Sequence, residues 1–246
     1  MTTWEKIFLL LQRFGPLFFQ GVLTTLLLAF TGIIVGLILG MGLALIRNIK
    51  IVHHDGKVTK LAKNSLKFLA TTYIEVFRGT PMMVQALIIY FGGKSIGIPW
   101  TYLSAGLVII SLNTTAYMAE IIRAGINGID SGQIEASRSI GMSNFKTMVY
   151  IVFPQALKNS IPTISNEFII NIKDSSVLNV ITVSELFMAA SIAASATYLF
   201  VESYIIIALI YLSLTLTFSQ ILKVIEKHLN LPYEERQGKR LRWKRS

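Results

Sequence analysis

The amino-acid sequence predicts an all-α integral membrane protein with five transmembrane helices in a single domain. Hydrophobic residues make up 53% of the 246 residues, and charged residues only 15%, against about 25% in soluble domains. Several apolar runs reach the ~20 residues that a helix needs to cross the hydrocarbon core of a bilayer. Basic residues gather beside these runs, where positive charge marks the cytoplasmic side of membrane spans.

Composition and motifs exclude several kinds of site. The chain has no cysteine, and its histidines, His53, His54 and His228, are too few and too scattered for a metal site. The net charge of +10 lies beside the apolar runs, so we do not expect a nucleic-acid surface. The glycine-rich run 36–42 lacks the Gly-Lys-Ser/Thr that cradles phosphate, so we expect no ATP-binding loop in this sequence.

The first two predicted spans carry glycine and proline at specific places. Span 17–46 follows an interfacial amphipathic segment and contains Gly32, Gly36 and Gly40, a ladder that permits close approach of another helix or simply reflects the frequency of glycine in membrane helices. Span 61–92 is broken at 78–81, because proline removes a backbone donor and disfavours helix in the preceding residue. The break is expected near the midplane, inside protein or beside a water-filled cavity.

The remaining predicted spans are 102–124, 151–175 and 198–222, and the polar segment 128–150 connects the third to the fourth. A short external helix is expected from Ser184. Eighteen of the 23 basic residues fall on one side of this arrangement, which places the N-terminus outside and the C-terminus with its basic tail in the cytoplasm.

The polar segment from Glu135 to Pro154 is prone to form a helix that docks outside the bilayer. Its small residues keep one helix face thin, and Gly141 permits a sharp turn without the left-handed penalty. The alternative is an ordinary amphipathic loop helix. Glu135-Ala136-Ser137, Gly141, Ile151 and Phe153-Pro154 resemble the EAA motif of bacterial ABC importer permeases, with serine and phenylalanine in place of alanine and leucine. The resemblance assigns coupling to an ATPase to Glu135, Ala136, Ser137, Arg138, Gly141 and Pro154.

Three further stretches resemble the polar amino acid permeases. They are RGTPMMVQ at 78–85 followed by IYFG at 89–92, SLNTTAY at 111–117 followed by EIIRAG at 120–125, and KDSSVL at 173–178. The resemblance implies the five-helix type I importer permease fold in a bacterial cell membrane. It also implies a dimer with a second copy or a paralogous permease, two ATP-binding subunits and an extracellular substrate-binding protein.

Ionisable residues inside the predicted spans indicate a pathway or a polar interior, because each costs ~2.5 kcal/mol or more on insertion scales. Glu167 and Asp174 are seven residues apart and therefore share a helix face, ~10 Å apart along the axis. We expect them to bind an ammonium or a cationic side chain. The alternative is a structural ion pair of a glutamate with Arg78 or Lys173. The predicted substrate-binding residues are Glu167, Asp174, Thr80, Gln85, Glu75, Asn113, Asn171 and Ser175.

The function predicted from these features is the membrane subunit of an ATP-driven importer, which moves a polar or cationic amino acid by alternating access and has no enzymatic activity of its own. One alternative is the same permease with cystine or another neutral amino acid as substrate. Another is an ion-coupled secondary amino acid carrier that uses the buried carboxylates as proton sites. An intramembrane enzyme would need a nucleophile with a base or a metal cluster, and the sequence shows neither.

Overall fold

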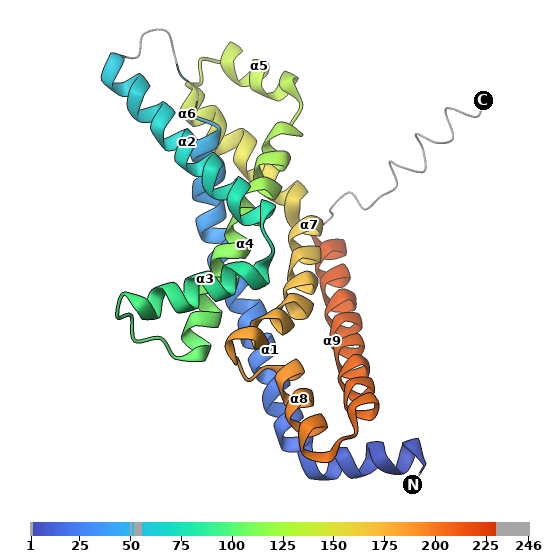
Figure 1. Ribbon diagram of the computed structural model, residues 1–246. Helices are drawn as coiled ribbons and strands as arrows, with labels where there is room; N and C mark the ends of the chain where they lie inside the picture. Colours follow the sequence, from blue (N-terminus) through green and yellow to red (C-terminus); the bar gives the residue numbers. More distant parts are fainter. Residues whose placement is uncertain (1, 50, 52–55, 230–246) are drawn as a thin grey trace, which may run out of the picture.

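The structure, a computed structural model, describes residues 2–49, 51 and 56–229, and its regular elements there are all helices (Figure 1). His53, His54 and the basic C-terminal tail lie outside the described residues. The elements in chain order are α1 (Thr3–Arg47), α2 (Lys57–Gly79), α3 (Met82–Ser95), α4 (Tyr102–Asn127), α5 (Ser131–Ser139), α6 (Asn144–Thr147), the π-helical turn η1 (Met148–Val152), α7 (Phe153–Asp174), the 3-10 helix η2 (Ser175–Ile181), α8 (Leu186–Thr197) and α9 (Phe200–His228).

Three of the described helices, α1, α4 and α9, are long and apolar enough to cross a bilayer. The run 144–181 and α8 also qualify if taken together, although they meet at a bend of 53°. The described part of the chain thus offers three to four candidate spans, in agreement with the predicted all-α membrane class. Helix α9 exposes Leu209, Leu212 and Leu216 along its length, as a helix against lipid tails does.

Helix α1 begins earlier than the predicted first span. It runs for 45 residues from Thr3, where a capping box with Thr2 and Glu5 satisfies its first backbone N–H groups. The predicted separate amphipathic segment is therefore the start of the same helix, with Pro16 in its interior. This first part lies across the ends of α8 and α9 (Figure 1), and Lys6 pairs with Glu202 of α9 at 3.1 Å.

The predicted break in the second span is confirmed. Helix α2 ends at Gly79, and α3 begins at Met82. Between them Thr80 and Pro81 are extended, with φ/ψ of −122°/148° and −64°/135°. Proline supplies no backbone N–H to continue α2, and its fixed φ begins a new helix favourably.

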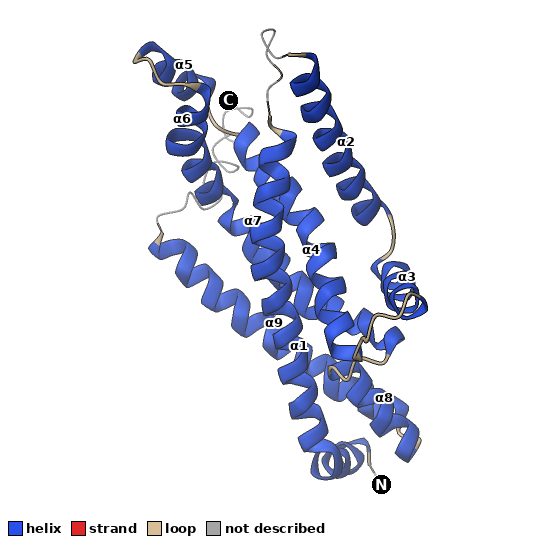
Figure 2. Ribbon diagram, turned by 90° about the vertical axis from the view of Figure 1, so that its left-hand side faces the viewer, coloured by secondary structure: helices blue, strands red, loops and turns tan. Residues whose placement is uncertain are grey.

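Helices α1 and α4 lie against each other over much of their length and form the centre of the molecule (Figure 2). A Cβ added at Gly36 would lie 2.7 Å from Cγ2 of Thr114, and one added at Gly40 would lie 2.6 Å from Cβ of Met118. The glycines at these positions let the two backbones approach closely, which is how helices associate without a hydrophobic driving force.

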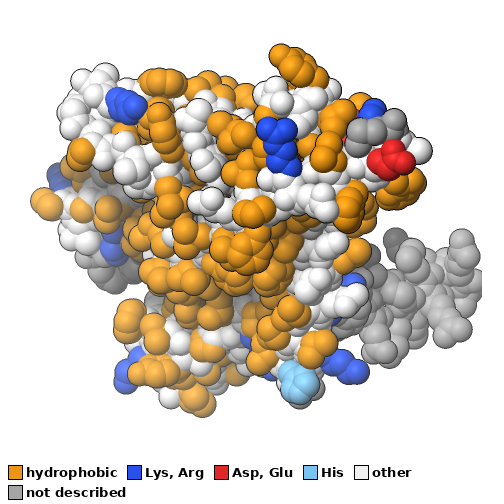
Figure 3. All heavy atoms as spheres, turned by 90° about the horizontal axis from the view of Figure 1, so that it is seen from below, with side chains coloured by type: hydrophobic (Ala, Val, Ile, Leu, Met, Phe, Trp, Pro, Cys, Tyr) orange, Lys and Arg blue, Asp and Glu red, His pale blue; other side chains and the backbone are white. Residues whose placement is uncertain are grey.

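The helices define two ends of the molecule. Helices α5 and α6 with the start of α2 form one end, called here the α5 end (Figure 1). Helix α8 and the start of α1 form the opposite α8 end. Viewed from the α8 end, the surface is mostly hydrophobic with few charged side chains (Figure 3). Helix α1 runs from the α8 end toward the α5 end (Figure 1).

The close contact of α1 with α4 predicts a position-specific effect of alanine. Gly40→Ala should destabilise the protein by about 1–3 kcal/mol, because the added methyl group overlaps Met118 and the backbone of Ala119. Thermal unfolding in detergent, followed by size-exclusion chromatography, measures the loss. Gly42→Ala is the matched control, since nothing lies within 4 Å of a Cβ at that position. Equal losses in both variants would contradict the packing argument.

Candidate functional site

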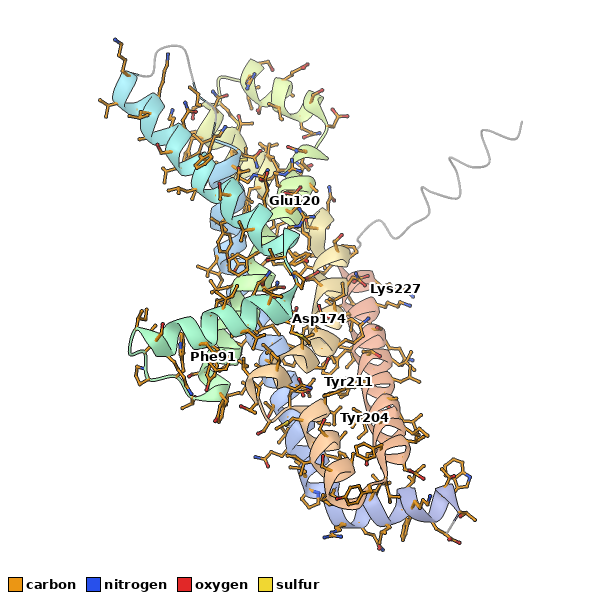
Figure 4. All side chains as sticks on the ribbon, in the orientation of Figure 1. Phe91, Glu120, Asp174, Tyr204, Tyr211 and Lys227 are labelled. Carbon is orange, nitrogen blue, oxygen red and sulfur yellow. The ribbon has the colours of Figure 1, made fainter. Side chains whose placement is uncertain are left out.

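A cavity of ≈ 520 Å³ lies between the end of α2, helix α4 and helix α7. It occupies the half of the molecule nearer the α5 end, and Glu120, one of its lining residues, lies closer to that end than Asp174 does (Figure 4). Its walls carry charges of both signs beside small and apolar groups. The lining residues are Arg78, Tyr117, Glu120, Ile121, Ala124, Gly125, Gly128, Asn159, Ser160, Thr163 and Glu167.

Glu120 of α4 joins three arginines from three helices. Its Oε2 lies 2.8 Å from Nη1 of Arg47 in α1 and 3.9 Å from Nη1 of Arg78 in α2. Arg123, one turn further along α4, donates from Nε to Oε2 at 3.0 Å and from Nη2 to Oε1. The cluster therefore carries more positive than negative charge at the wall of the cavity.

Arg78 extends from the last turn of α2 into the cavity. Its side chain is 42% exposed, and its guanidinium carbon lies 5.7 Å from the ring centroid of Tyr117. Arg47 and Arg123 approach Glu120 more closely than Arg78 does. Arg78 is therefore the least closely held of the three arginines.

Glu167 of α7 lines the same cavity from the other side. The residue is 8% exposed, and none of the ion pairs formed among the described residues includes it. The expected alternative, a direct ion pair with Arg78 or Lys173, is not formed in the structure. A buried carboxylate without a contacting cation is costly, which makes Glu167 the strongest candidate for a cationic ligand.

Gln85, Thr80 and Asn113, three predicted substrate residues, instead hold the break between α2 and α3. The Nε2 of Gln85 donates to the carbonyl of Phe77 at 2.8 Å and to the carbonyl of Thr80 at 2.9 Å. Its Oε1 accepts from Nδ2 of Asn113 at 2.9 Å. These bonds satisfy carbonyls that the break removes from the helical ladder, and none of the three residues lines the cavity.

Asn171 lies between helices rather than in the cavity. Its Oδ1 accepts from the hydroxyl of Thr114 at 3.2 Å, and its Nδ2 would lie 3.1 Å from a Cβ at Gly32. The residue is 3% exposed. It therefore belongs to the contact of α7 with α1 and α4, although its position four residues after Glu167 had predicted much the same helix face as that residue.

The other predicted substrate residues also lie outside the cavity lining. Asp174 and Glu75 are exposed, and the buried hydroxyl of Ser175 donates to the carbonyl of Ile172 at 2.9 Å. Asp174 lies midway along the molecule, near the end of α7 (Figure 4). Of the predicted set, Glu167 alone lines this cavity.

Glu185 is a fully buried acid that sequence reasoning missed. Its carboxylate accepts from the backbone N–H groups of Phe187 and Met188, each at 2.9 Å, and from the hydroxyl of Tyr211 at 2.8 Å. These are the bonds of a helix N-cap, so Glu185 fixes the start of α8 against α9. An acid directly before an apolar helical run was the signal for it.

The segment predicted to couple to an ATPase forms a helical hairpin at the α5 end. Helix α5 ends before Gly141, whose φ of +81° is a left-handed conformation that glycine adopts without a steric penalty. The hydroxyls of Ser137 and Thr147 lie 2.9 Å apart, and both residues are buried. Serine in place of the motif's alanine is thus matched by a partner across the hairpin, and Ser137 faces inward.

The outer surface of this hairpin combines charge with exposed apolar groups. Glu135, Ala136 and Arg138 are exposed on α5. Ile140 and Phe145, which sequence reasoning did not single out, are 78% and 75% exposed. Large apolar side chains exposed on a polar segment are typical of a protein-binding surface.

The chemistry available in the cavity is binding rather than catalysis. A guanidinium on one wall and an unpaired carboxylate on the other are complementary to a small molecule that carries both an acid and an ammonium group. Among the described residues, no group of three or more His, Cys, Asp or Glu side chains is arranged to hold a metal ion.

Comparison with known proteins identifies the family of this chain. The family model of the binding-protein-dependent transport system inner membrane component matches residues 59–231. A Rickettsia bellii protein named for glutamine transport, GlnP, is 38% identical over 212 residues, which are 85% of this chain and 91% of the relative. The arginine transport system permease protein ArtQ of Bacillus subtilis is 38% identical over 215 residues, with 87% and 93% covered.

Among solved structures, a crystal structure of an amino acid ABC transporter with histidines superposes with a TM-score of 0.80 at 41% identity, covering 90% of this chain and 98% of that one. These matches decide between the two transport classes in favour of the ABC permease over the ion-coupled carrier. The family model covers more than half of the residues of this chain. The chain therefore belongs to the binding-protein-dependent transport system inner membrane components, which are the permease subunits of ABC transporters and whose ATPase is a separate chain.

Proposed function

We propose that this chain is the permease of an ATP-driven importer that carries a polar or cationic α-amino acid into the cell through the cavity between α2, α4 and α7. The observation that carries the proposal is the pair of opposite charges, Arg78 and Glu167, in the lining of one cavity. Relatives named for arginine and glutamine transport support the substrate class. Neutral amino acids, including cystine, remain the second option within this class.

In this proposal, Glu167 binds the ammonium or the cationic side chain of the substrate. The other predicted residues act around it. Thr80, Gln85 and Asn113 fix the break that presents Arg78, and Asn171 and Ser175 hold α7 in place. Glu75 and Asp174 are exposed in this structure and would meet the substrate on the pathway to or from the cavity.

The chain crosses the membrane five times in this proposal. The five spans are α1, the α2–α3 pair, α4, α7 and α9. The basic loop between α1 and α2 and the α5 end then lie in the cytoplasm, and the N-terminus and the α8 end lie outside. The cavity lies on the α5 side of Glu167, so this arrangement corresponds to an inward-facing state of alternating access.

Coupling is assigned to the helical hairpin at the α5 end. Two ATP-binding subunits, which hold ATP and Mg, would contact its exposed residues, while an extracellular binding protein delivers substrate at the α8 end. A second copy of the chain, or a paralogous permease, would complete the pathway. The residues that carry the contact are Glu135, Ala136, Arg138, Ile140 and Phe145, with Ser137, Gly141 and Pro154 shaping the hairpin and the start of α7.

Reconstitution tests the proposed function directly. The permease, its ATPase and its binding protein are placed in liposomes, and uptake of radiolabelled L-arginine and L-glutamine is followed. Uptake should require internal ATP and stop with a non-hydrolysable analogue. Uptake driven by a proton gradient without ATP would overturn the proposal.

Replacing the buried acid of the cavity should weaken transport of a cationic substrate. Glu167→Gln keeps the shape of the side chain and removes its charge, so half-maximal uptake of L-arginine should need about tenfold more substrate. Asn166→Ala is the matched control, because the adjacent residue is exposed and does not line the cavity. Unchanged uptake in Glu167→Gln would remove this residue from the substrate site.

The turn at Gly141 should matter for coupling and not for substrate binding. Gly141→Ala places a side chain at φ +81°, a strain of about 1–2 kcal/mol that shifts the hairpin. ATP hydrolysis stimulated by the loaded binding protein should fall, while L-arginine binding to the permease is retained. Gly97→Ala is the control with equal strain, since Gly97 has φ +83° and a Cβ there would also meet open space. Gly97 lies between α3 and α4, away from the hairpin. Equal effects of both variants on hydrolysis would contradict the assignment.

A further inference from the structure

We infer that Arg78 binds the carboxylate of the transported amino acid, and that Glu120 is an internal carboxylate which holds Arg78 until the substrate replaces it. The inference rests on the proposed function and deepens it in two ways. It names the group that recognises the acid end of the substrate. It also identifies Glu120 as a positioning residue of the same site.

Gln85 and Thr80, two of the predicted substrate-binding residues, already use their hydrogen-bond donors within the protein. Both amide hydrogens of Gln85 are directed at the carbonyls of Phe77 and Thr80 and at the Thr80 hydroxyl. That hydroxyl itself donates to the carbonyl of Val76 at 2.7 Å. Binding a substrate there would leave the carbonyls at the break unsatisfied inside the membrane, which costs several kcal/mol each. The carboxylate therefore needs another donor on the cavity wall.

Arg78 is the lining residue whose donors best match a carboxylate. The guanidinium fork matches the two oxygens of a carboxylate, and such paired bonds are among the strongest that proteins form. The side chain is 42% exposed, although it lies at a break between two membrane helices. Its contact with Tyr117 is to the ring face, which leaves the N–H groups at the edge of the guanidinium free to bind.

The distances around Glu120 show why Arg78 is the arginine that can leave. Arg47 approaches the carboxylate to 2.8 Å, and Arg123 makes hydrogen bonds to both of its oxygens. Nη1 of Arg78 lies 3.9 Å from Oε2 of Glu120, which is beyond hydrogen-bond length. When Arg78 turns to a substrate carboxylate, Glu120 keeps two cations and Arg78 keeps one anion, so no charge is left unpaired at any point in the exchange.

The exchange has a structural consequence, because Glu120 connects three helices. Arg47 is the last residue of α1, Arg78 lies in the last turn of α2, and Glu120 lies in α4. Release of Arg78 removes one contact between the end of α2 and α4 and leaves α1 bound to α4. Occupation of the cavity thereby loosens one specific contact between helices, at the break.

The test compares an amino acid with its amide, which lacks the carboxylate. The permease is purified with its ATPase subunits in nanodiscs, without the binding protein, whose own preference for the carboxylate would mask the result. Equilibrium binding is measured for L-arginine and L-argininamide and for L-glutamine and L-glutaminamide. The wild-type complex should prefer the free amino acids. Arg78→Gln should bind them roughly 10- to 100-fold more weakly and leave the amides nearly unchanged, because only the carboxylate contact is lost.

Glu120→Gln separates positioning from binding. Removing the internal carboxylate should strengthen the preference for the free amino acids over their amides, since nothing competes for Arg78. A residue with a merely structural role would not move this ratio. Arg78→Lys keeps the charge but not the paired donors of the guanidinium, so its preference for the free amino acids over their amides should be intermediate. This variant also serves as the check that substitution at this position preserves the fold.

Lys158→Gln is the matched control, because it removes a positive charge from α7 near the same end without lining the cavity. It should leave the ratio unchanged. A folded Arg78→Gln complex that still prefers the free amino acids would overturn the inference and leave the proposed function standing. If the wild-type complex binds none of the four compounds, the substrate class of the proposed function is wrong, and the inference falls with it.

Discussion

The cavity depends on one constraint: a helix that breaks inside a protein must have the backbone carbonyls that it frees satisfied by other groups. Gln85 meets this need with its side-chain amide, and Asn113 of α4 holds Gln85 from the other side. The break can therefore exist at a fixed place. Because α2 ends there, Arg78 sits at a helix terminus beside α4 and α7, and the cavity acquires its positive wall.

The glycine contact between α1 and α4 gives this arrangement its rigidity. Close backbones at Gly36 and Gly40 make α1 and α4 a single support, on which α7 is placed by the bond from Thr114 to Asn171. In this support the hydroxyl of Thr114 donates to Oδ1 of Asn171. The charged residues at its edge, Glu120 and Glu167, are left to define the chemistry of the cavity.

Local signals in the sequence predicted those features that local physics determines. Pro81 marked the break, Gly141 marked the turn, and the glycine ladder marked a close helix contact. The spacing of Glu167 and Asp174 predicted a shared helix face, and only Glu167 lines this cavity, because a shared face says nothing about which neighbours cover each part of it. Glu120 was missed for a related reason: its partner Arg47 lies 73 residues away, so the cluster exists only after three helices have packed.

The π-helical turn η1 joins α6 to α7 without a gap, so residues 144–174 form one continuous helical run. A π turn contains more residues than an α turn. It therefore changes the direction in which the side chains of α7 point about the helix axis. Each residue of an α-helix advances the side-chain direction by ~100°. Conversion of η1 to regular α-helix would turn Glu167 about the axis of α7, ~30 Å from α6, and carry its carboxylate off the cavity wall. The register set by η1 is therefore part of what places Glu167 on the cavity wall.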